Sequence, residues 1–146
     1  LTQIVGEFSE KAEANQLEMV VECPQPPVEI YVDGRHLWRI IDNLMGNICK
    51  YAQPGTRVYI TLEKFHGMVI MTFRNISKDR LKMTSEELFG RFVRGDSSRN
   101  TEGHGLGLSI AKSLTELMHG NLAVQMDGDL FKVILSFEEY QEDKKQ

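Results

Sequence analysis

The chain has 146 residues and a formal net charge of −4, with 41% hydrophobic and 26% charged residues. This composition fits one globular domain with a single core, and the acidic balance argues against a general nucleic-acid-binding surface. The two cysteines lack CxxC spacing, which argues against a disulfide framework or a zinc site and favours a reducing compartment. No apolar run approaches the roughly 18 residues of a membrane-spanning helix.

The start of the chain indicates that it belongs to a longer protein. It does not begin with Met, and residues 2–15 already follow the pattern of an amphipathic helix, with Val5, Phe8 and Ala12 on one face. We therefore expect further segments before Leu1.

Strand and helix signals alternate in the first third of the chain. The β-rich segments 17–23 and 28–33 flank a cluster of prolines, which predicts two short strands around a turn. A strongly periodic helix follows at 35–52, with Asp33 as its N-cap. The apolar residues that recur at helical spacing along it are Leu37, Ile40, Ile41, Leu44, Met45 and Ile48.

A hairpin opens the second half of the predicted fold. Residues 57–65 and 68–75 alternate between apolar and polar side chains around His66-Gly67, which is typical of two strands joined by a tight turn. The later elements are a short helix at 84–89, a mobile polar loop at 95–105, a helix at 106–118, and strands at 121–126 and 130–138. We predict an α/β two-layer sandwich, a mixed or antiparallel sheet packed on three helices, with one domain over 1–138 and a solvated tail at 139–146.

Polar residues line one face of the helix at 35–52. In the segment N-L-M-G-N-I-C-K-Y, residues 43–51, Asn43, Asn47 and Lys50 lie at i, i+4 and i+7 and so share a face. An amide oxygen is a hard, neutral ligand for Mg²⁺, and an ammonium neutralises phosphate oxygens. The alternative is an ordinary solvated helix face.

Glycines open the helix at 106–118. The segment G-H-G-L-G-L at 103–108 allows close approach of a ligand to the backbone, and free N–H groups at a helix start attract phosphate. It does not follow a strand, so the Rossmann interpretation is poor, and it lacks Gly-Lys-Ser/Thr, so it is not a P-loop. The alternative is a flexible loop before a helix.

A third segment, L-F-G-R-F-V-R-G-D at 88–96, precedes the polar loop. Phe89 and Phe92 are candidates to anchor the base of the loop, and the arginines, which include Arg99 within the loop, are candidates to meet phosphate. The alternative is a short packed helix with exposed arginines.

In order and spacing, these segments resemble the histidine-kinase ATPase family, which has the Bergerat fold. Residues 43–51 resemble its N box, 88–94 its F box and 103–108 its G2 box, and the loop between the last two resembles the ATP lid. The resemblance covers about residues 1–138, nearly the whole chain.

The resemblance implies roles for the residues that match. Asn47 matches the Mg²⁺-binding asparagine, and Asn43 matches a polar position one turn earlier, which makes it a second candidate ligand. Lys50 matches a phosphate-contacting lysine, and Tyr51 an aromatic residue that lines the nucleotide site. The ATP-binding residues that the resemblance implies are Asn43, Asn47, Lys50, Tyr51, Asn75, Leu81, Arg91, Phe92, Arg94, Gly103, His104, Gly105, Leu106, Gly107 and Leu108.

The chain departs from the family at its G1 box, which is normally Asp-x-Gly-x-Gly. Asn75 stands where the family has Asp, and Ser77 and Asp79 stand where it has the two glycines. The family's Asp accepts a hydrogen bond from the adenine amino group; the Asn75 carbonyl oxygen also accepts, but without charge. Leu130 stands where the family has Thr before a Phe, so we expect a less polar adenine end.

The resemblance implies that the chain binds Mg²⁺ and ATP and donates the γ-phosphate to a histidine on a separate dimerisation and phosphoacceptor domain, with a response regulator downstream. None of the four histidines, His36, His66, His104 and His119, has the family's acceptor context. We assign no catalytic residue to this chain and expect a monomeric fragment, a cytoplasmic domain of a membrane-anchored parent. The alternatives are a degenerate nucleotide-sensing module without phosphotransfer, or another Bergerat-fold ATPase.

Overall fold

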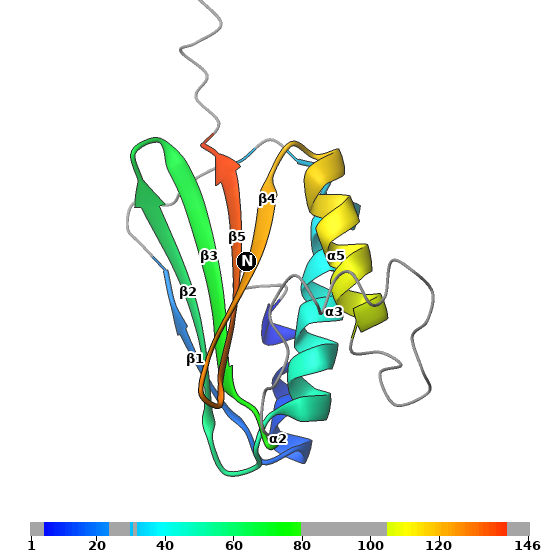
Figure 1. Ribbon diagram of the computed structural model, residues 1–146, viewed down its shortest axis with the longest axis vertical. Coiled ribbons are helices and arrows are strands. Elements are labelled where there is room, and N and C mark those ends of the chain that lie inside the picture. Colours follow the sequence, from blue (N-terminus) through cyan, green and yellow to red (C-terminus); the bar gives the residue numbers. More distant parts are fainter. Residues whose placement is uncertain (1–4, 24–29, 31, 80–104, 140–146) are drawn as a thin grey trace, which may run out of the picture.

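The structure is a computed structural model that describes residues 5–23, 30, 32–79 and 105–139. The strands in this part of the chain are β1 (Glu18–Glu22), β2 (Arg57–Phe65), β3 (Met68–Ile76), β4 (Asn121–Asp127) and β5 (Leu130–Glu138). The helices are α2 (Ser9–Ala14), α3 (Gly34–Tyr51) and α5 (Gly105–Leu117). The strands form one layer and the helices form a second layer on one face of it (Figure 1).

The sheet has the order β1-β2-β3-β5-β4. β1 pairs parallel with β2, whereas the other neighbours pair antiparallel, so the predicted mixed sheet and two-layer sandwich are confirmed. The β2–β3 hairpin turns at the predicted dipeptide, where His66 has a φ of 50° and Gly67 a φ of 78°. Two successive residues at positive φ are typical of the tight turns that match the twist of a hairpin.

Helix α3 forms where its cap and its apolar period predict it. The Asp33 side chain accepts a hydrogen bond from the Arg35 backbone N–H at 2.8 Å, which satisfies one of the free donors at the helix start. Five of the six predicted apolar residues are buried, and Leu37 is half-buried against the same core. Burial of each such side chain contributes about 1.5–3 kcal/mol. Cys49 is also buried, and desolvation raises the pKa of its thiol, as expected for a small core residue.

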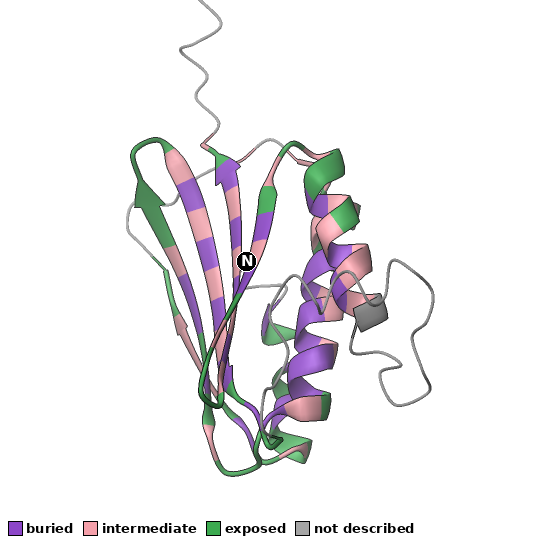
Figure 2. Ribbon diagram, viewed as in Figure 1, coloured by how far each residue is buried: buried purple, intermediate pink, exposed green. Residues whose placement is uncertain are grey.

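The inner face of the sheet meets the helices through alternating apolar residues. Val58 and Ile60 of β2 and Phe73 of β3 are among the buried core residues, while the residues between them face away from the helices. Figure 2 shows this alternation as buried and partly exposed bands along the strands. The sheet therefore has one face covered by helices and one open face among the described residues.

The end of α5 is fixed by a tight turn into β4. His119 adopts a left-handed φ of 65°, and the Gly120 N–H donates to the Thr115 carbonyl at 2.9 Å, which closes the last turn of the helix. A Cβ atom at Gly120 would lie 2.5 Å from the Phe137 ring, so only glycine fits this approach of the turn to β5.

The first predicted helix is interrupted. Residues 5 and 6 are helical, but residues 7 and 8 form a turn before α2, in which the Phe8 N–H donates to the Val5 carbonyl at 2.9 Å, and residues 2–4 lie outside the described part of the chain. Gly6 directly precedes this turn, and glycine is a poor helix former. The apolar stripe was correct nevertheless, because Val5, Phe8 and Ala12 are all buried.

Other predicted elements are described only in part. Of the predicted strand at 28–33, Ile30 makes an isolated antiparallel bridge to Glu139. The predicted helix at 84–89 and all but the last residue of the predicted loop at 95–105 lie outside the described residues, and so do residues 140–146. Within the described ranges, no helix is long and apolar enough to cross a membrane.

Candidate functional site

The polar stripe of α3 exists as predicted. Asn43, Asn47 and Lys50 lie on one uninterrupted helix, and their spacing places them on one face. Asn47 is buried, Asn43 is half-buried and Lys50 is exposed, so the stripe leads from the interior to the surface at the C-terminal end of the helix.

The first turn of α5 lies against this stripe. A Cβ atom at Gly107 would lie 3.7 Å from Oδ1 of Asn43, so the glycine leaves the asparagine amide within van der Waals reach of the α5 backbone. The fold therefore brings together two motifs that are far apart in the sequence. Leu108 and Ala111 are completely buried and hold this end of α5 on the core.

The Asn43 amide has an unused donor. Its Nδ2 atom is buried and makes no hydrogen bond within the described residues. A buried donor without a partner costs about 1–3 kcal/mol, so such a group is retained where a ligand satisfies it. An oxygen-rich ligand between α3 and the start of α5 fits this position. Rotation of the amide would instead present Oδ1, which can face a cation.

The end of β3 is tied to the end of α3 through the backbone. The Gln53 N–H donates to the Ile76 carbonyl at 2.7 Å, and the Lys78 N–H donates to the Tyr51 carbonyl at 2.9 Å. An isolated bridge also joins Ala52 to the segment after β3. Tyr51, the residue after Lys50 at the end of α3, therefore lies beside the end of β3, where the variant G1 segment begins.

Asn75 points to the same side of the sheet as the helices. It is buried, it follows the buried Phe73 by two residues, and it pairs in register with Phe131 of β5. Side chains two residues apart on a strand share a face, so its amide lies on the side that α3 covers. Asn75 is therefore buried beside the end of α3.

The two positions where the family has glycine form a polar turn here. The Asp79 N–H donates to the Ser77 hydroxyl at 3.2 Å, and the Ser77 N–H donates to the Asp129 carbonyl of the β4–β5 turn at 2.8 Å. Ser77 is buried. A serine that hydrogen-bonds to the backbone two residues later holds a turn without glycine.

Lys50 and Tyr51 meet at the outer end of the stripe. The Lys50 Nζ atom lies 5.6 Å from the centroid of the Tyr51 ring, within the range of a cation–π contact. This contact holds an ammonium group near the C-terminal end of α3, on the polar face of the helix.

Some predicted site residues lie outside the described residues: Leu81, Arg91, Phe92, Arg94, Gly103 and His104. Gly105 and Leu106 belong to the first turn of α5, where only the backbone is described. The prediction did not include Ser109 of α5, whose buried hydroxyl makes no hydrogen bond within the described residues. In the sequence, Ser109 is a single hydroxyl residue within the apolar run that follows the glycines, and this feature could have pointed to it.

The described residues contain no set of acidic, histidine or cysteine ligands for a metal ion. They contain no group of three or more His, Cys, Asp or Glu side chains that could hold an ion. A divalent cation here would depend on amide oxygens and on the oxygens of a bound phosphate, which is how Mg²⁺ is often held.

A family model described as "Histidine kinase-, DNA gyrase B-, and HSP90-like ATPase" matches residues 32–141, which include α3, β3 and α5. The chain belongs to this ATPase family. The prediction of the catalytic ATP-binding domain of the sensor histidine kinase type is also confirmed, since the curated and solved proteins that this ATPase domain matches include sensor histidine kinases.

Two curated relatives illustrate the similarity. The ATPase domain is 32% identical to the sensor histidine kinase RppB of Synechocystis sp. over 140 residues, covering 92% of this chain and 31% of the relative. It is 39% identical to the probable sensor protein PcoS of Escherichia coli over 107 residues, covering 70% of this chain and 23% of the relative. The chain thus spans about a third or less of these relatives.

Solved structures agree with the fold. The catalytic domain of histidine kinase ThkA superposes with a TM-score of 0.78 at 19% identity, covering 94% of this ATPase domain and 89% of that chain. The mycobacterial sensor histidine kinase MprB superposes with a TM-score of 0.72 at 21% identity, covering 94% and 93%. At these identities the likeness concerns the fold, which is the predicted Bergerat-type sandwich.

Proposed function

We propose that this ATPase domain binds Mg²⁺·ATP between α3, the end of β3 and the start of α5, and that it presents the γ-phosphate to a histidine on a separate phosphoacceptor domain. The observation that carries the proposal is the Asn43 amide, which is half-buried against Gly107 with its Nδ2 donor unused. Such a donor, beside the buried Asn47 and the N-terminus of a helix, suits a ligand rich in phosphate oxygens.

The polar stripe supplies positioning and charge neutralisation, which is most of what a protein contributes to phosphoryl transfer. Asn47 would offer its amide oxygen to Mg²⁺, with Asn43 beside it. Lys50 would neutralise phosphate oxygens at the outer end of the stripe, and the first N–H groups of α5 would donate to them. When bound, Mg²⁺ neutralises charge that develops on the phosphoryl group during transfer.

The acceptor histidine would come from another domain. The described histidines lie in the first turn of α3, in the hairpin turn and in the turn after α5, at His36, His66 and His119. His36 lies on the same face of α3 as Asn43 but about two turns before it, and His66 and His119 lie in turns. We expect no acid-labile phosphate on this chain when it is incubated alone with labelled ATP. Stoichiometric acid-labile phosphate on the isolated chain would contradict this assignment.

The sensor kinases among the relatives suggest the wider context. We propose that the chain works with the dimerisation and phosphoacceptor domain of the same kinase and with a response regulator downstream. We also propose that it is the cytoplasmic part of a membrane-anchored parent. The fragment itself would be a monomer.

The variant G1 segment favours one alternative. Asn75, Ser77 and Asp79 replace the residues that the family uses at the adenine end, so a nucleotide-sensing module without phosphotransfer is the second candidate. Transfer of labelled phosphate to a supplied phosphoacceptor domain separates the two functions. Nucleotide binding without transfer would favour the sensor.

The binding proposal is tested by calorimetric titration of ATP with and without Mg²⁺. Asn43→Ala and Asn47→Ala should each weaken binding, and Asn47→Ala should abolish most of the dependence on Mg²⁺. Asp42→Ala is the matched control, because Asp42 is half-buried on the same helix but lies off the stripe. Equal losses in all three variants would show that the stripe is not the site.

A further inference from the structure

The open face of the sheet carries a pair of cations in direct register. Arg74 of β3 pairs with Lys132 of β5, and both residues alternate with buried core residues, so both point away from the helices. Residues opposite each other on neighbouring strands have Cβ atoms about 4.5–5.5 Å apart, where like charges destabilise a sheet. Neither side chain makes an ion pair within the described residues.

The pair shares its cavity with Glu22 and Glu63, but neither carboxylate forms an ion pair with Arg74 or Lys132 within the described residues. The Arg74 guanidinium lies 5.5 Å from the centroid of the Tyr59 ring, and its Nε atom is buried without a hydrogen-bond partner among the described residues. By contrast, Arg57 nearby already has Glu18 at 3.3 Å, and Tyr59 and Glu18 both raise its pKa. The positive charge that is available for an outside partner is therefore concentrated on Arg74 and Lys132.

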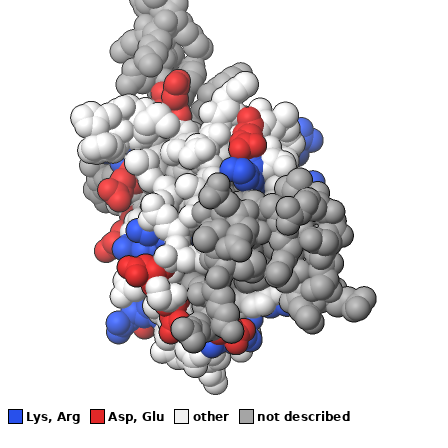
Figure 3. Space-filling model, in the orientation of Figure 1, with Lys and Arg blue, Asp and Glu red and all other residues white. Residues whose placement is uncertain are grey.

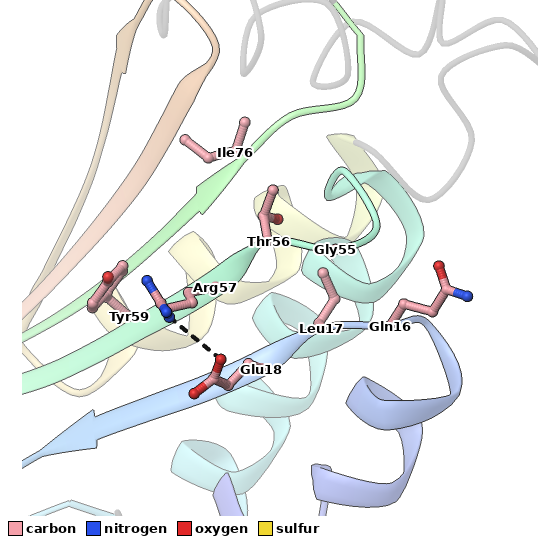
Figure 4. A pocket seen from close by; sticks show the side chains of 8 residues that line it. All are labelled: Gln16, Leu17, Glu18, Gly55, Thr56, Arg57, Tyr59 and Ile76. Atoms are coloured by element: carbon pink, nitrogen blue, oxygen red, sulfur yellow. Dashed lines mark hydrogen bonds and ion pairs between the residues drawn. The ribbon is translucent and has the colours of Figure 1, made fainter.

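One cavity lies beside this cation pair, and a second cavity contains it. One, of about 610 Å³, lies at the edge of the sheet and is drawn in Figure 4; Tyr59 and Ile76 border it, and Leu17 forms part of its apolar lining. The other, of about 590 Å³, crosses the open face and includes Arg74 and Lys132 in its lining. Tyr59 and Ile76 are 37% and 36% exposed, so both side chains can contact a partner.

The spacing of these features matches an extended peptide. Arg74 and Ile76 lie two residues apart on β3 and face the same side, which places them about 6.5–7 Å apart along the strand. An extended peptide repeats its side chains on one side at the same interval. An apolar residue beside Tyr59 and Ile76 would therefore put the side chain two residues further on between the two cations.

We propose that the open face of the sheet docks an extended acidic segment of a partner protein. An apolar side chain enters the cavity beside Tyr59 and Ile76, and a carboxylate two residues away pairs with Arg74 and Lys132. This site lies on the opposite face from the proposed nucleotide site and does not depend on it. A single carboxylate fits better than a polyanion, because Glu22 and Glu63 line the same cavity as the cations and would repel a nucleic acid or an anionic membrane.

The test uses the full 146-residue chain with saturating ATP and Mg²⁺, and fluorescein-labelled peptides GSGXTETGS with Leu, Ile or Phe at X. We expect fluorescence anisotropy to show binding of these peptides, and amide chemical shifts to change on β2, β3 and β5. Peptides with Ala at X or with Lys in place of Glu should bind at least tenfold more weakly. No binding by any of the three acidic peptides, or equal binding by the Lys peptide, would overturn the proposal.

Variants of the chain separate this surface from general electrostatics. Lys132→Glu should reduce peptide affinity at least tenfold without lowering the melting temperature, because it removes a like-charge pair. Lys132→Gln should give a smaller loss and serves as the second variant if the first fails to fold. Lys11→Glu makes the same charge change on exposed α2 and should leave peptide affinity unchanged.

The remaining outcomes concern other partners. Vesicles of phosphatidylglycerol and inorganic phosphate are tested with the same variants. Binding of vesicles that depends on Lys132, in the absence of peptide binding, would show a membrane surface in place of the proposed peptide dock. Equal loss of peptide affinity in Lys11→Glu and Lys132→Glu would assign the binding to net charge and would also overturn the proposal.

Discussion

The two faces of helix α3 use the same backbone for opposite purposes. The face that meets the sheet carries Ile41, Leu44 and Ile48, all buried in the core. The face that meets α5 carries Asn43 and Asn47, which place amides in protected positions. Each apolar residue contributes about 1.5–3 kcal/mol to folding, whereas the unused donor of Asn43 costs about 1–3 kcal/mol.

The difference between the two faces indicates which residues of α3 serve function and which serve folding. A residue that lowers stability in a protected position persists when it does something else. The apolar face is explained by folding alone. The unused Asn43 donor on the polar face is explained by a ligand, and substitutions on the two faces should therefore separate stability from nucleotide binding.

The largest expected effect is on the apolar face. Leu44→Ala should lower the free energy of unfolding by about 2–5 kcal/mol, because a fully buried side chain leaves a cavity. Urea denaturation followed by circular dichroism measures the change. Under conditions where the variant remains folded, ATP affinity should change little. A stability loss below about 1 kcal/mol would mean that this face is less tightly packed than the structure indicates.

On the polar face, Asn47→Ala should act on binding first. We expect loss of most of the Mg²⁺-dependent part of ATP affinity, a change of tenfold or more, which corresponds to about 1.4 kcal/mol. Calorimetry with and without Mg²⁺ measures it. An unchanged Mg²⁺ dependence in a folded variant would remove Asn47 as the metal ligand.

Asn43→Leu should move stability and binding in opposite directions. Leucine has a similar shape and no polar atoms, so the variant should gain about 1 kcal/mol of stability as the unused donor is removed. ATP binding should weaken at the same time. A variant that loses both stability and binding would show that the Asn43 amide supports the native packing.

At the adenine end, Asn75→Asp should sharpen recognition. A charged acceptor contributes about 1.5–3 kcal/mol against about 0.5–1.5 for a neutral one, so ATP affinity should rise by about 1 kcal/mol, roughly fivefold. The preference for ATP over GTP should rise as well, because the Asn amide can also donate to guanine whereas Asp cannot. Titration of both nucleotides into both proteins measures this. If neither affinity changes, adenine is not bound through Asn75.

The smallest effect is expected far from both faces of α3. His66→Asn in the β2–β3 turn should raise stability by roughly 0.5–1 kcal/mol, because asparagine tolerates a positive φ better than histidine. Nucleotide affinity should stay the same. A change in ATP affinity in this variant would mean that stability and binding are coupled throughout the domain and are not divided between the two faces of α3.

The sequence predicted the elements that local periodicity controls. The β2–β3 hairpin, α3 and α5 were placed within about one residue, because alternation, caps and turn residues act over short distances. The shared face of Asn43 and Asn47 followed from helix geometry alone. The break in the first helix at residues 7 and 8 was not predicted, because the apolar stripe continues through it.

Contacts between distant segments were not predictable from the residues alone. The approach of Gly107 to Asn43 depends on how two helices pack, and the register of Arg74 with Lys132 depends on strand pairing across the sheet. A shift of one residue in that register would turn every side chain to the other face. The family resemblance predicted the position of the G1 segment. In the structure, a hydrogen bond from the Lys78 N–H to the Tyr51 carbonyl holds this segment beside the end of α3.

Helix α3 is anchored at both ends, by the Asp33 cap and by the bridge from Ala52 to the segment after β3. Each residue of an α-helix turns the chain by about 100°. A single insertion between Asn43 and Asn47 would therefore swing one part of the polar stripe toward the sheet and expose apolar residues. Surface turns such as those at Gly55 and Gly128 tolerate changes in chain length. An insertion or deletion within α3 would instead disturb both its buried face and its polar stripe. Over evolutionary time α3 can therefore change its sequence far more readily than its length.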